Sequence, residues 1–76
     1  MQSPLLIHLR KINKLSYDRI ASRLKISIED YKKLECGEYL LEQKRSRKLA
    51  SLFGVKWRII YFEIWQNYYF NQLVQL

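Results

Sequence analysis

Cysteine and histidine are scarce in this chain of 76 residues, which contains one of each. The single cysteine, Cys36, excludes a disulfide within the chain. Cys36 and His8 together provide too few soft ligands for a structural zinc site, so the sequence predicts no metal site. A reducing, cytoplasmic location is the simplest expectation. Arg10 and Lys11 interrupt the first apolar run, so no signal peptide is expected.

Catalytic patterns are also missing. The two glycines do not form a phosphate-binding loop, and neither an acid nor a nucleophile stands next to His8 in the sequence. The seven acidic residues are explained by helix caps, ion pairs or surface charge. The sequence therefore predicts that the protein is not an enzyme and needs no cofactor.

A membrane span is not expected either. The segment 57–76 is long enough for a span, but it contains Arg58, Glu63 and five Asn or Gln residues. Such polar side chains are costly in hydrocarbon. Because the segment lacks glycine and proline, it is predicted to be one long helix. A β-strand is the alternative, since Tyr, Phe and Ile favour strands.

The net charge of the chain is +7, and the basic residues are unevenly placed. Residues 1–56 contain thirteen of the fourteen Lys and Arg and six of the seven Asp and Glu, whereas residues 57–76 are neutral. A small basic domain indicates a polyanionic partner, and nucleic acid is the first candidate. The alternative is that the charge only solvates the surface.

Residues 15–37 contain two helix starts, one short turn and one helix stop. Ser16 and Ser27 are good N-caps, and Ser27 has capping-box spacing to Asp30. The apolar spacing predicts helices over 17–24 and 28–36, and Gly37 suits the left-handed conformation that ends a helix. Two short helices joined in this way form a helix-turn-helix, which places its second helix in the DNA major groove.

Three further helices are predicted. One begins at Ser3-Pro4, one covers 42–53 and ends at Gly54, and one covers 57–76. The expected fold is therefore all-α, a compact helical bundle of about five helices in a single domain. Residues 1–56 would form the helix-turn-helix core, and residues 57–76 a C-terminal helix that packs on it.

Aromatic residues gather on one sector of the predicted helix over 57–76. Ile60 and Ile64 lie outside that sector, on a side that also carries polar residues such as Asn67 and Asn71. The other helices are too small to cover so much apolar surface, and exposed aromatic surface usually marks a protein interface. The residues expected in a dimer or partner interface are Trp57, Tyr61, Trp65, Tyr68 and Tyr69.

Several short groups of residues occur in a fixed order along the chain. They are Leu9-Arg10, Leu15-Ser16, Ile20-Ala21, Ile26-Ser27, Glu35-x-Gly37, Leu49-Ala50 and Phe53-Gly54-Val55. In this order and spacing, over about residues 5–62, the chain resembles the lambda-repressor/Cro-like helix-turn-helix family, often called the XRE family. The resemblance implies a DNA-binding domain in which residues 28–36 form the recognition helix.

The resemblance also implies roles for individual residues. Arg10 and Glu35 match a partly buried ion pair of the family. Base contacts are expected from outward-facing residues of the recognition helix, namely Ile28, Glu29, Lys32 and Lys33. Candidate phosphate contacts are Tyr17, Arg19, Lys25, Ser27 and, from the basic run near the start of the helix over 42–53, Lys44 and Arg45. Lys25 replaces the usual glycine of the turn, which would cost up to about 1 kcal/mol if the residue is left-handed.

These observations predict a small sequence-specific regulator of transcription that binds double-stranded DNA as a homodimer. The alternative is a helix-turn-helix scaffold for protein–protein interaction, such as an antitoxin-like partner-binding module with weak or no specific DNA binding. Its support is the acidic pair Glu29-Asp30, the unusual Ile28 and the aromatic segment 57–76. Steep salt dependence would distinguish DNA binding from an apolar protein interface.

Overall fold

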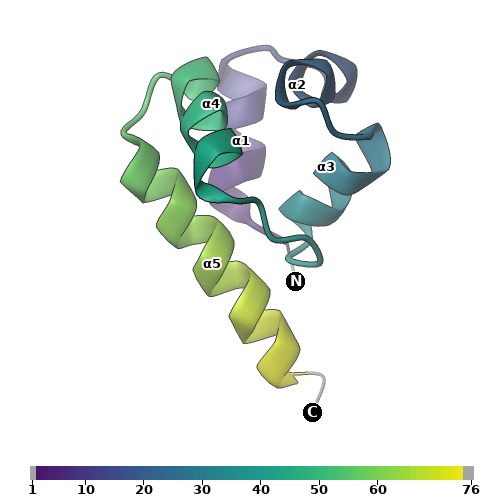
Figure 1. The fold of residues 1–76 in the computed structure, drawn as a ribbon, viewed down its shortest axis with the longest axis vertical. Coiled ribbons are helices and arrows are strands. Elements are labelled where there is room, and N and C mark those ends of the chain that lie inside the picture. The colour runs from purple at the N-terminus through teal and green to yellow at the C-terminus, as the bar shows by residue number, and fades with distance from the viewer. Residues whose placement is uncertain (1, 75–76) are drawn as a thin grey trace.

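The computed structural model describes residues 2–74, which form five α-helices and no strand (Figure 1). The helices are α1 (Pro4–Ile12), α2 (Tyr17–Leu24), α3 (Ile28–Glu35), α4 (Gln43–Phe53) and α5 (Trp57–Val74). The prediction of an all-α bundle is confirmed. The strand alternative for the last segment is wrong over residues 57–74, and residues 75–76 of the predicted helix lie outside the described residues.

Serine caps fix the starts of α2 and α3. The Ser16 Oγ accepts a hydrogen bond from the Arg19 backbone N–H at 3.1 Å, and the Ser27 Oγ accepts from the Asp30 N–H at 3.0 Å. Each bond satisfies an amide that has no partner within its own helix. The two helix starts therefore lie where the sequence predicts them.

The other ends of the helices differ from the prediction by one residue or not at all. Cys36 is the C-cap of α3 and not its last helical residue, and Glu42 is the N-cap of α4 and not its first. Lys25 ends α2 in the left-handed conformation, with φ 58° and ψ 44°. Gly54 ends α4 in the same way, with φ 70°. The lysine thus bears the backbone strain that a glycine avoids.

The core lies at the centre of the bundle and takes apolar side chains from all five helices. Tyr31 and Leu34 of α3 are almost completely buried, and so are Ile60 and Ile64 of α5. The remaining core side chains are Leu6, Leu9, Ile20, Ala21, Leu24, Leu41, Leu49, Ala50 and Phe53. These contacts fix which face of α3 points outward.

The inner side of α5 is more polar than the sequence suggested. Asn67 and Asn71, assigned from the sequence to a polar side, are buried together with Ile60 and Ile64. The Asn71 Nδ2 donates to the Gly37 carbonyl oxygen at 3.2 Å. The polar residues are buried because the far half of α5 packs on the backbone after α3, whose carbonyl needs a donor.

Gly37 lets this backbone approach α5 closely. Its φ is +77°, and a Cβ at this position would lie 3.0 Å from both the Nδ2 and the carbonyl oxygen of Asn67. A side chain would therefore strain the backbone and also crowd Asn67 of α5, which would have to shift. The N-terminus is tied to the same region, since the Ser3 Oγ donates to the Glu63 Oε2 at 2.6 Å. The Ser3 N–H donates to the Glu35 carbonyl oxygen at 2.7 Å.

Candidate nucleic-acid interface

The outer face of α3 is open to solvent. Tyr31 and Leu34 point into the core, so the side of α3 away from them faces solvent. This outer face consists of the four residues predicted as base contacts, Ile28, Glu29, Lys32 and Lys33, all of which are exposed. The structure thus groups these four side chains on one face, and their contact with bases stays a prediction.

A largely buried ion pair connects α3 to α1, on the side of α3 away from its outer face. The Arg10 Nε lies 2.7 Å from the Glu35 Oε2, and the two side chains are only 13% and 5% exposed. The hydrogen bond to Glu35 raises the pKa of Arg10 above its usual value, against the effect of burial. This is the pair that the family resemblance implies, and it connects the last turn of α1 to the last residue of α3.

Tyr17 belongs to the same cluster. Its hydroxyl accepts a hydrogen bond from the Arg10 Nη2 at 3.1 Å and donates to the Glu35 Oε1 at 3.4 Å. The Arg10 guanidinium carbon also lies 4.2 Å from the centroid of the Tyr17 ring, within range of a cation–π interaction. The cluster therefore connects α1, the first residue of α2 and the end of α3.

This position changes what Tyr17 offers to a phosphate. Its hydroxyl points to the ion pair, so the backbone amides at the start of α2 are the groups there that suit an anion. Lys32 of α3 lies near the start of α2, since its Nζ is 5.2 Å from the centroid of the Tyr17 ring. The start of α2 and one side of α3 therefore share a basic surface.

Tyr31 lies deeper, next to this cluster. Its ring centroid is 6.0 Å from that of Tyr17, and its hydroxyl is the one buried side-chain polar atom among residues 2–74 without a hydrogen bond. Burial raises the pKa of Tyr31 far above its ordinary value of 10.0, and the nearby Glu35 carboxylate raises it further. The tyrosine is therefore a neutral core residue.

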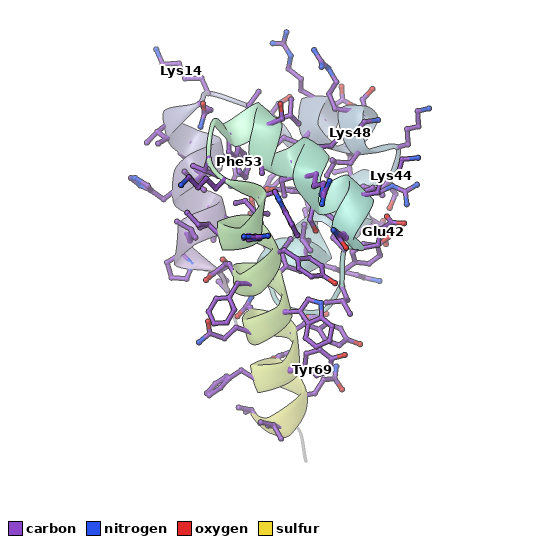
Figure 2. All side chains as sticks on the ribbon, turned by 60° about the vertical axis from the view of Figure 1, so that its left-hand side comes forward. Lys14, Glu42, Lys44, Lys48, Phe53 and Tyr69 are labelled. Carbon is purple, nitrogen blue, oxygen red and sulfur yellow. The ribbon has the colours of Figure 1, made fainter. Side chains whose placement is uncertain are left out.

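A second basic surface lies between the end of α2 and the start of α4. Lys25, Lys44 and Arg45, all predicted as phosphate contacts, line a shallow hollow of about 190 Å³ together with Leu24, Glu42 and Lys48. Figure 2 shows Lys44 and Lys48 along one side of α4, with Glu42 at its start. Lys48 is not among the residues predicted from the sequence, although its spacing of four residues from Lys44 places both on one helix face.

Arg45 is held in place within this hollow. Its Nε donates to the Leu24 carbonyl oxygen at 2.7 Å, and its Nη1 lies 2.7 Å from the Glu42 Oε1. The guanidinium therefore caps the C-terminal end of α2. The other positive charges of the hollow belong to Lys25, Lys44 and Lys48. The other two predicted phosphate contacts, Arg19 and Ser27, are exposed but do not line the hollow.

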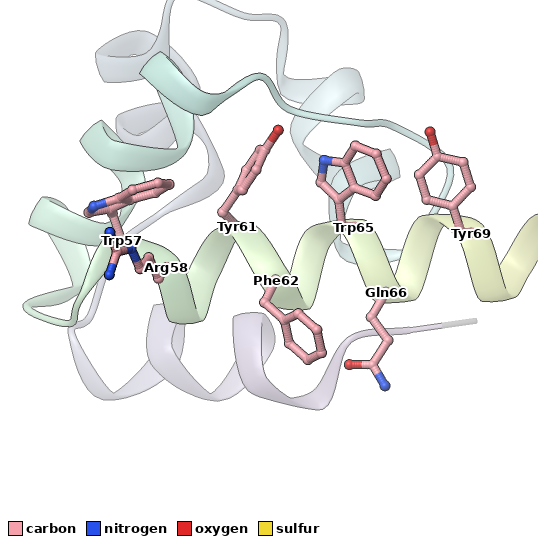
Figure 3. Close-up of a pocket in the computed structure, with 7 residues that line it drawn as sticks. All are labelled: Trp57, Arg58, Tyr61, Phe62, Trp65, Gln66 and Tyr69. Atoms are coloured by element: carbon pink, nitrogen blue, oxygen red, sulfur yellow. The ribbon is translucent and has the colours of Figure 1, made fainter.

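Aromatic side chains form a row along α5 (Figure 3). Trp57, Tyr61, Trp65 and Tyr69 follow one another with ring centroids 5.9, 6.2 and 4.6 Å apart. Trp65 and Tyr69 are exposed, whereas Trp57, Tyr61 and Tyr68 are half-buried. The predicted interface residues are thus partly covered by their own domain.

Other features of the chain give little indication of function. Among residues 2–74, no group of three His, Cys, Asp or Glu side chains is arranged to hold a metal ion. Over the same range, none of the helices has both the length and the hydropathy that crossing a membrane requires. Comparison with known protein families, characterised proteins and solved structures gives no match.

Proposed function

We propose that the protein is a small, sequence-specific DNA-binding regulator of transcription of the lambda-repressor/Cro-like type, acting as a dimer in the cytoplasm. The observation that carries the proposal is the outer face of α3. It is exposed and contains two lysines, and the Arg10–Glu35 pair holds it rigidly from behind. Base reading needs such a preorganised helix, because each side chain must meet a fixed pattern of groups in the major groove.

Each residue of this face has a matching group on DNA. Lys33 would donate to the O6 and N7 of guanine, Glu29 would accept from the N4 of cytosine, and Ile28 would pack on a thymine methyl group. Each good base contact is worth about 1–3 kcal/mol of discrimination. Lys32, whose Nζ lies near the Tyr17 ring, would contact DNA at the edge of the interface.

Phosphate contacts would position α3 in the groove. The hollow with Lys25, Lys44 and Lys48 offers three ammonium groups next to the turn that precedes α3. Further phosphates would be contacted by Arg19, Ser27 and the backbone amides at the start of α2. These contacts are independent of sequence, and they give the affinity its salt dependence.

The test is selection of bound duplexes from a random DNA pool with the full chain at near-physiological salt. We expect one enriched motif, and an inverted repeat with half-sites about one helical turn apart if two copies bind together. Affinity should fall steeply between about 50 and 200 mM salt.

Lys33→Glu should abolish selection of the motif, because it places a negative charge against guanine acceptors. Lys56→Glu is the matched control, since it makes the same charge change at an exposed site between α4 and α5. If both variants select the wild-type motif with equal affinity, α3 does not read bases.

The second candidate is a protein-interaction module built on the same scaffold. Three observations favour it: Glu29 and Asp30 are negative, Ile28 is exposed, and α5 carries exposed aromatic surface. A pool selection without any enriched sequence, and with only weak binding, would support this function. Binding to the protein partner would then respond little to salt, because apolar contacts are not screened.

A further inference from the structure

The outermost side of α5 carries an apolar stripe next to the aromatic row. The stripe consists of Ile59, Phe62, Gln66, Tyr69 and Leu73, spaced alternately by three and four residues, and all five are exposed. Phe62 and Leu73 each expose 67% of their surface, and Ile59 exposes 50%. Alternation of three and four is the a/d pattern of a coiled-coil heptad. We call these five residues the outer stripe.

The same heptad positions account for the buried residues of α5. With Ile59 at an a position, the buried residues Ile60, Ile64, Asn67 and Asn71 fall at b and f positions. In a coiled coil, b and f lie on the side opposite the a/d seam. The side of α5 that packs on its own domain is therefore opposite the outer stripe, which is left open for another helix.

We propose that the outer stripe pairs with the outer stripe of a second copy of this chain, with the two α5 helices parallel and in register. This inference rests on the proposed dimer and states how its two copies meet. It places the contact on the outer stripe, with the half-buried Trp57, Tyr61 and Tyr68 outside its centre.

Charge on α5 favours a second copy in this orientation. The stripe itself is uncharged, and the charged residues of α5 are Arg58, at a g position, and Glu63, at an e position. In a parallel pair each g residue meets the e residue five positions on in the partner, so Arg58 would face Glu63 twice. In an antiparallel pair g faces g and e faces e, and Arg58 would meet no acid. The Ser3 hydroxyl donates to the Glu63 Oε2, which leaves Oε1 as a second acceptor.

Gln66 would select the register. It stands at the central a position of the stripe, and in a parallel, in-register pair it faces Gln66 of the second copy. Two side-chain amides can donate to and accept from each other. A single polar residue at an a position fixes register at some cost in stability.

The surface of α5 is also shaped for a helix. An open groove of about 570 Å³ runs along one flank of the outer stripe, and Phe62, Gln66 and Tyr69 of the stripe line it together with Trp57, Arg58, Tyr61 and Trp65 (Figure 3). Side-chain rows four residues apart pack into such grooves of a neighbouring helix. Burial of Ile60 and Ile64 already holds α5 in helical form, so pairing does not have to order it.

Cysteine cross-linking tests the orientation. In a full-length Cys36→Ala background, Ile59→Cys alone and Leu73→Cys alone should each give a disulfide-linked dimer under mild oxidation. Ile12→Cys is the control, because Ile12 of α1 is also an exposed isoleucine, at 59% against 50% for Ile59. If the single variants stay monomeric but a mixture of Ile59→Cys and Leu73→Cys forms a mixed disulfide, the helices are antiparallel, and the proposed orientation is wrong.

Sedimentation of the unmodified chain and of Phe62→Ser tests the stripe without cysteines. We expect Phe62→Ser to raise the dimer dissociation constant by about 100-fold or more, because two phenylalanines leave the contact. Its helix content and thermal midpoint as a monomer should not change, since Phe62 is exposed. A wild-type chain that sediments as a monomer throughout, or a dimer unaffected by Phe62→Ser, overturns the inference. A monomeric wild-type chain that still selects a DNA half-site would overturn this inference and leave the proposed DNA binding standing.

Discussion

The Arg10–Glu35 pair gives the sharpest prediction about stability. Glu35→Gln removes the negative charge and leaves the Arg10 guanidinium buried, with a side chain only 13% exposed. Removing one partner of a buried pair costs about 3–5 kcal/mol, and the Gln oxygen still accepts a hydrogen bond, so we expect about 3 kcal/mol. The free energy of unfolding of a domain of this size is roughly 4–11 kcal/mol, so this loss is a large part of it. At roughly 4–8 °C per kcal/mol, the thermal midpoint should fall by roughly 12–24 °C.

The assay is urea unfolding of both proteins at neutral pH, followed by circular dichroism, with the slope of the transition compared. Glu42→Gln is the matched control, because Glu42 pairs with Arg45 at the same distance of 2.7 Å but with side chains 55% and 38% exposed. The control should lose about 0.5 kcal/mol or less, as exposed pairs do. Equal losses in the two variants would refute the reasoning that burial makes the Arg10–Glu35 pair important.

Two further variants follow from strained or unsatisfied groups. Tyr31→Phe removes a buried hydroxyl that makes no hydrogen bond of good geometry and lies close to the Glu35 carboxylate, so the free energy of unfolding near pH 7 should change by less than about 1 kcal/mol, as measured by urea titration. Since the folded-state pKa of Tyr31 is raised, its contribution is present below about pH 10 and is lost as the pH rises further. The wild type should therefore lose up to about 1.4 kcal/mol per pH unit more than Tyr31→Phe above pH 10, and parallel alkaline curves would contradict this. Lys25→Gly should stabilise the fold by about 0.5–1 kcal/mol because it relieves the left-handed lysine, yet weaken DNA binding and reduce its salt dependence; an unchanged salt slope would remove Lys25 from the phosphate contacts.

Local signals in the sequence were sufficient for the helices and for the direction in which α3 faces. Ser16 and Ser27 have the side-chain chemistry of N-caps, and both make the bonds that this chemistry predicts. The spacing of Tyr31 and Leu34 determined which face of α3 is buried. These features depend on neighbours within four residues, so a single sequence contains them.

Features that depend on distant neighbours could not be predicted. Nothing local marks Asn71 as buried, because its partner is the Gly37 carbonyl of another segment, 34 residues away. The direction of the Tyr17 hydroxyl likewise follows from Arg10 and Glu35, which only the fold brings beside it. Lys25 and Lys44 share one hollow for the same reason. Polar residues of long helices are therefore the ones for which amphipathic patterns mislead most easily.

The contacts at the end of α3 connect the two proposed surfaces of the protein. The Glu35 side chain accepts a hydrogen bond from Arg10, and its backbone carbonyl accepts one from the Ser3 N–H. The Gly37 carbonyl accepts a hydrogen bond from the Asn71 side chain of α5. In each copy, hydrogen bonds of Ser3 and Asn71 therefore connect the end of α3 and the residues after it to α5. If two copies pair through α5, the distance between their recognition helices is set by these buried contacts. The half-site spacing of the selected DNA would then report directly on the geometry of the α5 pair.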